Sequence, residues 1–242
     1  MSGRPARSGE TEPVGTAIGI DGCLGGWLTV EWSTEGISAN RVTDLKPLLN
    51  RLRAGQVAAL AIDMPIGLLD RQPRACDTEA RRLLGPRRSS IFPTPVRATL
   101  EATDYADACR LSRQCSGKAL SIQAFNLLPK IAELDRLVVP ADQDRLVEAH
   151  PECAFRRLAD GPLAHAKRTE EGRQQRIDLL SQYDSALGQM VTEEIASSRR
   201  LPVLDLIDAT VLAITARRVI EGTEHRLGDD VDELGLAAQI VY

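Results

Sequence analysis

Aromatic and histidine side chains are scarce in this sequence. Phe, Tyr and Trp together make up 3% of the 242 residues, and there are three histidines. The five cysteines include no C-x-x-C pair, and no two histidines have the spacing of a zinc finger. A structural zinc site and a disulfide scaffold are therefore not expected, and a reducing, cytoplasmic environment is the expected location. If the chain binds a metal ion, carboxylates must hold it.

Long apolar runs are also missing. No stretch reaches 18 consecutive apolar residues, which argues against a membrane span and against a membrane as partner. Residues 1–15 are polar and lack the apolar centre of a secretory signal, so we expect a disordered tail there. The length predicts that residues 16–242 form a single domain with an insertion.

Neither sign of charge dominates the chain. The 34 acidic and 30 basic side chains give a net charge of −4. This balance argues against a basic coat that wraps nucleic acid or a membrane surface, although it leaves room for a local basic patch.

Apolar patterns in the first 62 residues predict four strands. Short segments rich in β-branched or aromatic residues, at 16–21 and 27–32, flank a glycine-rich stretch of hairpin length. Residues 36–42 fit a third strand with a weaker pattern. The run VAALAI at 57–62 is apolar throughout, which is typical of a central strand buried on both faces.

Helical patterns dominate the rest of the chain. A helix is predicted at 45–54, and the segment from about 71 to 140 has a helical texture interrupted by turns. A fifth strand is predicted at 145–149, before His150-Pro151. Three further helices are predicted at about 170–180, 182–197 and 203–221.

Several acidic residues lie at the ends of these elements, where a solvated helix face does not explain them. Carboxylates at the ends of buried strands are costly to desolvate, and several together repel one another unless a divalent ion neutralises them. Two magnesium or manganese ions would do so, and would activate water for attack on a phosphodiester. These candidates are Asp21, Asp63, Glu148, Glu152, Asp205 and Asp208.

Five of these six acids also have a structural interpretation. Asp21 precedes a glycine turn, and Asp63 precedes Met-Pro and could cap a strand end. Asp205 could be an acid of the first helical turn, favoured by the helix dipole. Of Glu148 and Glu152, one could be a ligand while the other pairs with a nearby arginine.

The order of these motifs resembles the ribonuclease-H-like superfamily. Its features are an acid-ended strand, a glycine hairpin, a helix, a second acid-ended strand and a late D-x-x-D-A helix, which is similar to the acidic helix of Holliday-junction resolvases. The chain is similar to an uncharacterised family of predicted ribonuclease-H-like nucleases. The matching stretches are IGIDGCLGGW (18–27), AIDMPIGL (61–68), RACDTEAR (74–81), SSIFPTPVR (89–97), VEAHPECAF (147–155), KRTEEGRQQR (167–176) and DLIDATVLA (205–213).

This resemblance implies an α/β fold with a five-stranded mixed sheet of order 3-2-1-4-5. It implies helices on both faces of the sheet and a helical insertion, about 71–140, after strand 4. It also implies that Asp21, Asp63 and Asp208 are metal ligands for magnesium or manganese. Glu148, Glu152 and Asp205 would be auxiliary catalytic residues.

Arginine is concentrated close to the predicted site. Between residues 71 and 97 there are seven arginines and two acids. If this run lines the crevice it could clamp phosphates, since the arginine fork matches phosphate oxygens. The alternative is a solvated helix face in which neighbouring acids and arginines pair. The predicted substrate-binding residues are Arg74, Arg81, Arg97, Lys167 and Arg176.

Four other polar residues near the motifs are interpreted as structural. Cys23 is expected to be a small buried thiol, since no histidine is close in sequence, and His150 a packed strand-end residue. Gln123 and Lys130 fall on one predicted helix, at 120–134, where a crevice-facing Gln123 could alternatively contact a substrate. The two aromatic residues near the arginine run, Phe92 and Tyr105, are too few for a single-strand stacking platform.

These observations lead to one main hypothesis and two alternatives. The main hypothesis is a metal-dependent nuclease or phosphodiesterase that hydrolyses a phosphodiester of a nucleic acid or nucleotide by a two-metal mechanism. The first alternative is a nucleotide-binding protein of the actin or sugar-kinase type, which usually needs two such domains. The second is a non-catalytic binding protein in which the acids form buried ion pairs with the arginine run.

Overall fold

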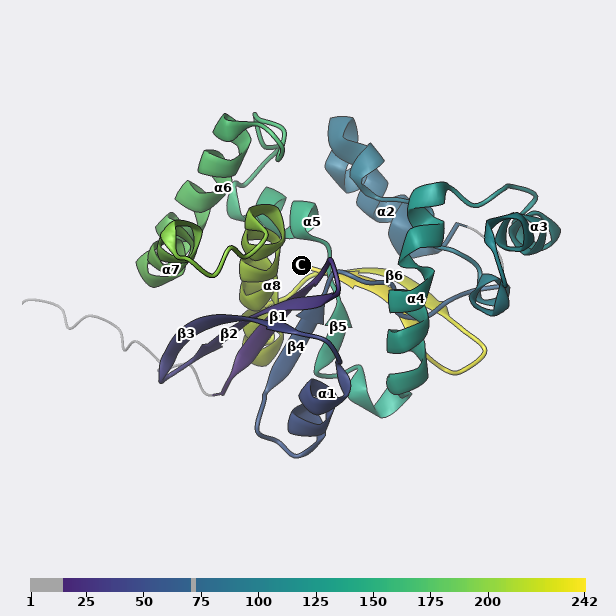
Figure 1. The fold of residues 1–242 in the computed structure, drawn as a ribbon, viewed down its shortest axis with the longest axis horizontal. Coiled ribbons are helices and arrows are strands. Elements are labelled where there is room, and N and C mark those ends of the chain that lie inside the picture. The colour runs from purple at the N-terminus through teal and green to yellow at the C-terminus, as the bar shows by residue number, and fades with distance from the viewer. Residues whose placement is uncertain (1–14, 71–72) are drawn as a thin grey trace, which may run out of the picture.

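The computed structural model describes residues 15–70 and 73–242, and a five-stranded mixed sheet lies at its centre (Figure 1). The predicted tail, apart from Gly15, lies outside the described residues. The first three strands form an antiparallel meander, and the last two run parallel to the first. The predicted order is confirmed: β3-β2-β1-β4-β5. The strands are β1 (Ala17–Cys23), β2 (Gly26–Ser33), β3 (Gly36–Val42), β4 (Ala59–Ile62) and β5 (Leu146–Glu148).

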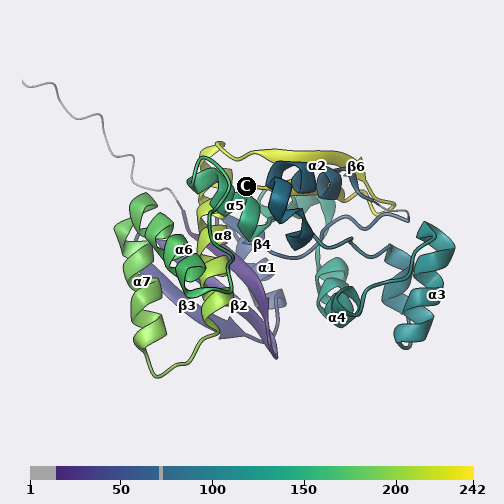
Figure 2. The same ribbon diagram turned by 90° about the horizontal axis from the view of Figure 1, so that it is seen from above.

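Helices cover both faces of the sheet, as predicted (Figures 1 and 2). Successive residues of a strand point to opposite faces, so Ile18 and Ile20 of β1 join one core cluster while Ala17 joins the other side. The first face packs against α1 (Lys46–Arg53) and α4 (Ile122–Leu137). The second face packs against α5 (Pro151–Leu158), α6 (Glu170–Tyr183), α7 (Ser185–Ala196) and α8 (Val203–Glu221).

Helix α8 approaches β1 closely at Gly19. A Cβ added to Gly19 would lie 2.0 Å from the Ala209 carbonyl oxygen and 2.2 Å from the Ala213 nitrogen. No side chain fits there, so residue 19 must be glycine for the helix backbone to touch the strand. This contact sets how near α8 lies to the sheet.

Gly19→Ala is expected to destabilise the protein by about 1–3 kcal/mol, because helix and strand must separate to admit the methyl group. Urea denaturation followed by circular dichroism measures the loss. The matched control is Gly161→Ala, whose methyl would have the Ala159 carbonyl oxygen as its nearest neighbour at 4.0 Å. Equal denaturation midpoints for the two variants would contradict this account of the contact.

The segment between β4 and β5 is helical, as the sequence predicts. Its last helix, α4, returns to the sheet, whereas α3 lies toward the edge of the molecule (Figure 2). A small apolar cluster of its own, which includes Ala108, Cys109 and Leu120, joins α3 to the first half of α4. The elements are α2 (Ala75–Leu84), η1 (Gly85–Ser90), η2 (Arg97–Glu101), α3 (Tyr105–Ser116), α4 and η3 (Pro140–Asp142).

A C-terminal hairpin is a feature that the sequence analysis did not predict. Strands β6 (Arg226–Val231) and β7 (Ala237–Val241) pair with each other and pack on α2, where Ala238 and Ile240 meet Cys76. One bridge, between Ala149 and Val241, connects the hairpin to the end of β5. Among the described residues, none of the helices combines the length and apolar character needed to cross a bilayer.

Candidate active site

Two aspartates lie side by side at the carboxyl end of the sheet. Asp21 belongs to β1 and Asp63 follows β4, and these two strands pair in parallel with Ile20 opposite Ile62. The Asp63 amide donates to the Ile20 carbonyl oxygen at 2.9 Å, which continues the ladder by one residue. The parallel register therefore brings both carboxylates to one edge of the sheet.

Asp208 reaches the same edge from α8. Its side chain is almost fully buried, at 3% exposure, and it accepts a bond from Lys167 Nζ at 2.9 Å. Burial raises the pKa of Asp208, and the positive charge of Lys167 partly offsets this effect. Burial also lowers the pKa of Lys167, but the charges of Asp208, Asp63 and Asp21 outweigh it, so Lys167 stays protonated.

The three aspartates act on one another electrostatically. Burial, followed by the charges of Asp63 and Asp208, raises the pKa of Asp21 well above its ordinary value. Burial and the charge of Asp208 raise the pKa of Asp63 to about 7. Such mutual shifts arise when like charges share a poorly solvated site, which favours binding of a proton or another cation.

A cleft of about 570 Å³ opens onto this edge. Asp21 and Asp63 line it, together with the Lys167 that holds Asp208. Opposite them stand residues of η1 and α4, so the insertion forms one wall of the cleft. The other lining residues include Met64, Arg87, Ser89, Ser90, Phe92, Gln123, Leu127, His150, Glu152 and Arg168.

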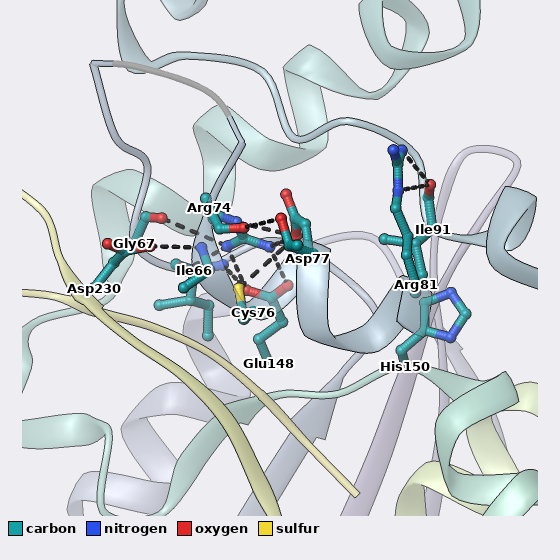
Figure 3. A network of polar contacts seen from close by, with 12 residues as sticks. Ile66, Gly67, Arg74, Cys76, Asp77, Arg81, Ile91, Glu148, His150 and Asp230 are labelled. Atoms are coloured by element: carbon teal, nitrogen blue, oxygen red, sulfur yellow. Dashed lines mark hydrogen bonds and ion pairs between the residues drawn. The ribbon is translucent and has the colours of Figure 1, made fainter. Parts of the chain in front are cut away.

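Glu148, at the end of β5, is held by an arginine rather than facing this cleft. Arg74 donates to both of its carboxylate oxygens, from Nη1 to Oε2 at 2.8 Å and from Nη2 to Oε1 at 2.6 Å. Arg74 also donates to Asp77 Oδ1 at 2.7 Å and to the Ile66 carbonyl oxygen at 2.9 Å (Figure 3). Burial raises the pKa of Glu148 to about 7, although Arg74 opposes the shift.

Comparison with protein families shows where this chain belongs. Residues 19–233 match the family described as "Protein of unknown function (DUF429)". The chain is a member of the DUF429 family. No curated protein and no solved structure matches it.

Four of the five cations predicted to bind substrate are engaged with other groups of this DUF429 chain. Arg74 is 2% exposed within its ion pairs, and Arg176 is 1% exposed beside Glu152, with Nη2 2.5 Å from Oε1. Arg97 pairs with Asp135 and Asp232. The side chain of Arg81 donates to the Ile91 carbonyl oxygen.

Among the described residues of the DUF429 chain three cations line the cleft, and Lys167 is the one that the sequence predicts to bind substrate. The others are Arg87, which also donates to the Leu163 carbonyl oxygen at 2.9 Å, and Arg168. The sequence contains a signal for both arginines, because Arg87 belongs to the arginine run and Arg168 follows Lys167. Charge density alone did not distinguish them from the buried arginines.

Asp205 and Glu152 lie near the three aspartates but in different surroundings. Asp205 lies one turn before Asp208, where burial and the charge of Asp208 raise its pKa, but it lines a neighbouring hollow and not the cleft. Glu152 lines the cleft but is paired with Arg176. His150 also lines the cleft, and its Nδ1 has no partner within the described chain.

The donor set of this DUF429 protein consists of oxygen ligands. Asp21, Asp63 and Asp208 offer only carboxylate oxygens, which suit magnesium or manganese. In the described part of the chain, however, no three His, Cys, Asp or Glu side chains form a group that could hold a metal as arranged. The Lys167 ammonium bonds to Asp208 where an ion would need that carboxylate. The donor chemistry fits a hard cation that displaces Lys167.

Proposed function

We propose that this protein is a ribonuclease-H-like, metal-dependent phosphodiesterase that hydrolyses nucleic acid. The observation that carries the proposal is the set of three aspartates, from β1, β4 and α8, at one edge of the sheet beside a cleft lined by three cations. Acids alone could form a structural cluster. Acids and cations that line one cleft suit a phosphate group, whose charge is negative and whose transition state gains from metal ions.

In this proposal Asp21, Asp63 and Asp208 hold magnesium or manganese. When bound, such an ion polarises the phosphoryl oxygens and lowers the pKa of a water molecule. Lys167 is kept protonated by the acids around it, so it donates hydrogen bonds and cannot act as a base. Once released from Asp208, its ammonium can donate to a phosphoryl oxygen, and Arg168 adds a guanidinium beside it.

Glu148 and Glu152 serve as positioning residues in this scheme. Glu148 accepts the Ile66 amide at 2.7 Å, and Ile66 lies in the turn just after Asp63. The bond therefore fixes the path of the chain that carries Asp63. Glu152 fixes Arg176 of α6, and both glutamates act through other residues instead of touching substrate.

The direct test is hydrolysis of labelled oligonucleotides, single-stranded, duplex and branched, by the purified full chain. We expect cleavage with manganese or magnesium, loss of cleavage when EDTA removes the metal, and recovery when the metal is returned. An absence of cleavage on all three substrates, together with a melting temperature that no divalent metal changes, would refute the proposal.

A non-catalytic binding role is the alternative that one observation favours. Three acids predicted to be catalytic are in ion pairs: Glu148 with Arg74, Glu152 with Arg176 and Asp208 with Lys167. In that case manganese should not raise the melting temperature, because the ammonium of Lys167 already occupies the Asp208 carboxylate. Metal-dependent stabilisation that disappears in Asp21→Asn would favour the enzyme instead.

A further inference from the structure

We propose that the wall of the cleft formed by Phe92 and α4 binds one unpaired nucleobase next to the scissile phosphodiester. This inference rests on the proposed function and names its substrate more closely. The wall presents three side chains of complementary chemistry: the Phe92 ring, the Leu127 side chain and the Gln123 amide. All three line the same cleft as Asp21 and Asp63.

The cleft has two chemically different walls. Asp21 and Asp63 lie at the sheet edge and Lys167–Arg168 on the chain leading to α6, whereas Phe92, Gln123 and Leu127 come from the segment after η1 and from α4. Met64, beside Asp63, and Arg87, in η1, also line the cleft. Figures 1 and 2 both show α4 and α6 on opposite sides of the end of β1. A nucleotide has the same division, because its phosphate is charged and its base is flat and apolar with a polar edge.

Helix α4 is fixed to the hairpin that carries Asp21. Lys130 Nζ donates to the Gly26 carbonyl oxygen and lies 4.3 Å from the centre of the Trp27 ring. Glu133 accepts the Trp27 indole N–H at 3.1 Å and the Leu45 amide at 3.1 Å. These bonds tie the second half of α4 to β2 and to the start of α1.

The residues proposed to contact the base lie on the same face of this anchored helix. Gln123, Leu127 and Lys130 are spaced four and three residues apart, so they stack along one side of the helix. Gln123 is exposed and Leu127 is half-buried. The anchor at Lys130 therefore holds this side of α4 beside the hairpin that carries Asp21.

The chemistry of the wall matches a base that is not paired. A phenyl ring stacks on any base, and a glutamine amide, with one acceptor and two donor hydrogens, can bond to the Watson–Crick edge. In a duplex this edge is occupied and both faces of the base are covered. Phe92 is the one phenyl ring among the described residues that line the cleft, so one base is bound. Tyr105 instead packs edge-on against Phe125, with 5.3 Å between ring centroids.

The test compares two single-stranded oligonucleotides of equal sequence, one of which has an abasic site at the scissile step. Loss of one stacked base is expected to slow cleavage by about tenfold or more. In Phe92→Leu and in Gln123→Ala, the ratio of the cleavage rate of the intact strand to that of the abasic strand should fall toward one. Ile122→Ala is the matched control: Ile122 neighbours Gln123 but is 57% exposed and does not line the cleft. It should keep the full ratio.

A binding measurement makes the outcomes distinguishable. Fluorescence anisotropy with the same oligonucleotides and with a duplex, in the presence of manganese, reports affinity whether or not cleavage occurs. Tighter binding of the intact single strand than of the abasic strand or the duplex, lost in Phe92→Leu, supports the subsite. Equal affinities overturn it, even if hydrolysis is found. If no oligonucleotide is cleaved but the base-dependent affinity persists, the proposed hydrolysis fails and the base subsite stands.

Discussion

Replacing Asp63 with asparagine is expected to lower metal-dependent hydrolysis on the order of a thousandfold. The substitution keeps the shape of the side chain but removes one of the charges that attract a divalent ion, and it leaves Asp21 with a neutral neighbour. Initial rates on a labelled oligonucleotide with saturating manganese measure the effect. The control is Asp144→Asn, an exposed acid just before β5 and at its opposite end, which should keep the wild-type rate.

Stability distinguishes this loss from simple misfolding. The pKa of Asp63 is raised from 3.8 to about 7 in the folded protein. Protonation of Asp63 therefore stabilises the folded state below about pH 4, and this stabilisation is lost as the pH rises through about 7. Asparagine carries no such charge. Without metal at pH 8, Asp63→Asn should therefore melt at a higher temperature than the wild type. An inactive variant that melts lower would not support the assignment.

Arg74→Met is expected to destabilise the fold by about 3–5 kcal/mol, because it leaves Glu148 and Asp77 buried without their shared cation. Both acids are nearly inaccessible, at 6% and 2% exposure. Urea denaturation at neutral pH measures the loss of unfolding free energy. The matched control is Arg82→Met, an exposed arginine of α2, the helix that Arg74 precedes, and it should change stability by about 0.5 kcal/mol or less.

A second variant examines the same network from its acidic side. Glu148→Gln should cost less than Arg74→Met, since burial already raises the pKa of Glu148 to about 7 and a neutral group there is tolerated. If Arg74 instead bound substrate, as its sequence context suggested, Arg74→Met would keep wild-type stability and raise KM. The unfolding free energy reports the first outcome and KM reports the second, so the two measurements distinguish them.

The sheet was predictable because its signals are local. The run 57–62 is apolar throughout and ends in an acid, and β1 also contains an acid near its end, so a parallel pairing places both acids at one edge. The sheet order followed from the resemblance and is confirmed. The C-terminal hairpin was missed because RLGDDV, at 226–231, shows no apolar alternation.

Partners of buried charges were not predictable in the same way. Arg74 and Glu148 are 74 residues apart in sequence, and Arg176 and Glu152 are 24 apart. The numbers of arginines and acids in a segment give its net charge, but they do not show which guanidinium is buried. Arg87 lies within η1 and Lys167–Arg168 lie just before α6, so their places at the cleft depend on how η1 and α6 pack.

The contact between Gly19 and α8 has a consequence for how the site tolerates mutation. Asp21 lies two residues after Gly19, and Asp208 immediately precedes Ala209, whose carbonyl lies where a Cβ of residue 19 would be. Their separation is therefore set by main-chain atoms in direct contact. The same rigidity means that a single methyl group at position 19 misaligns both acids at once.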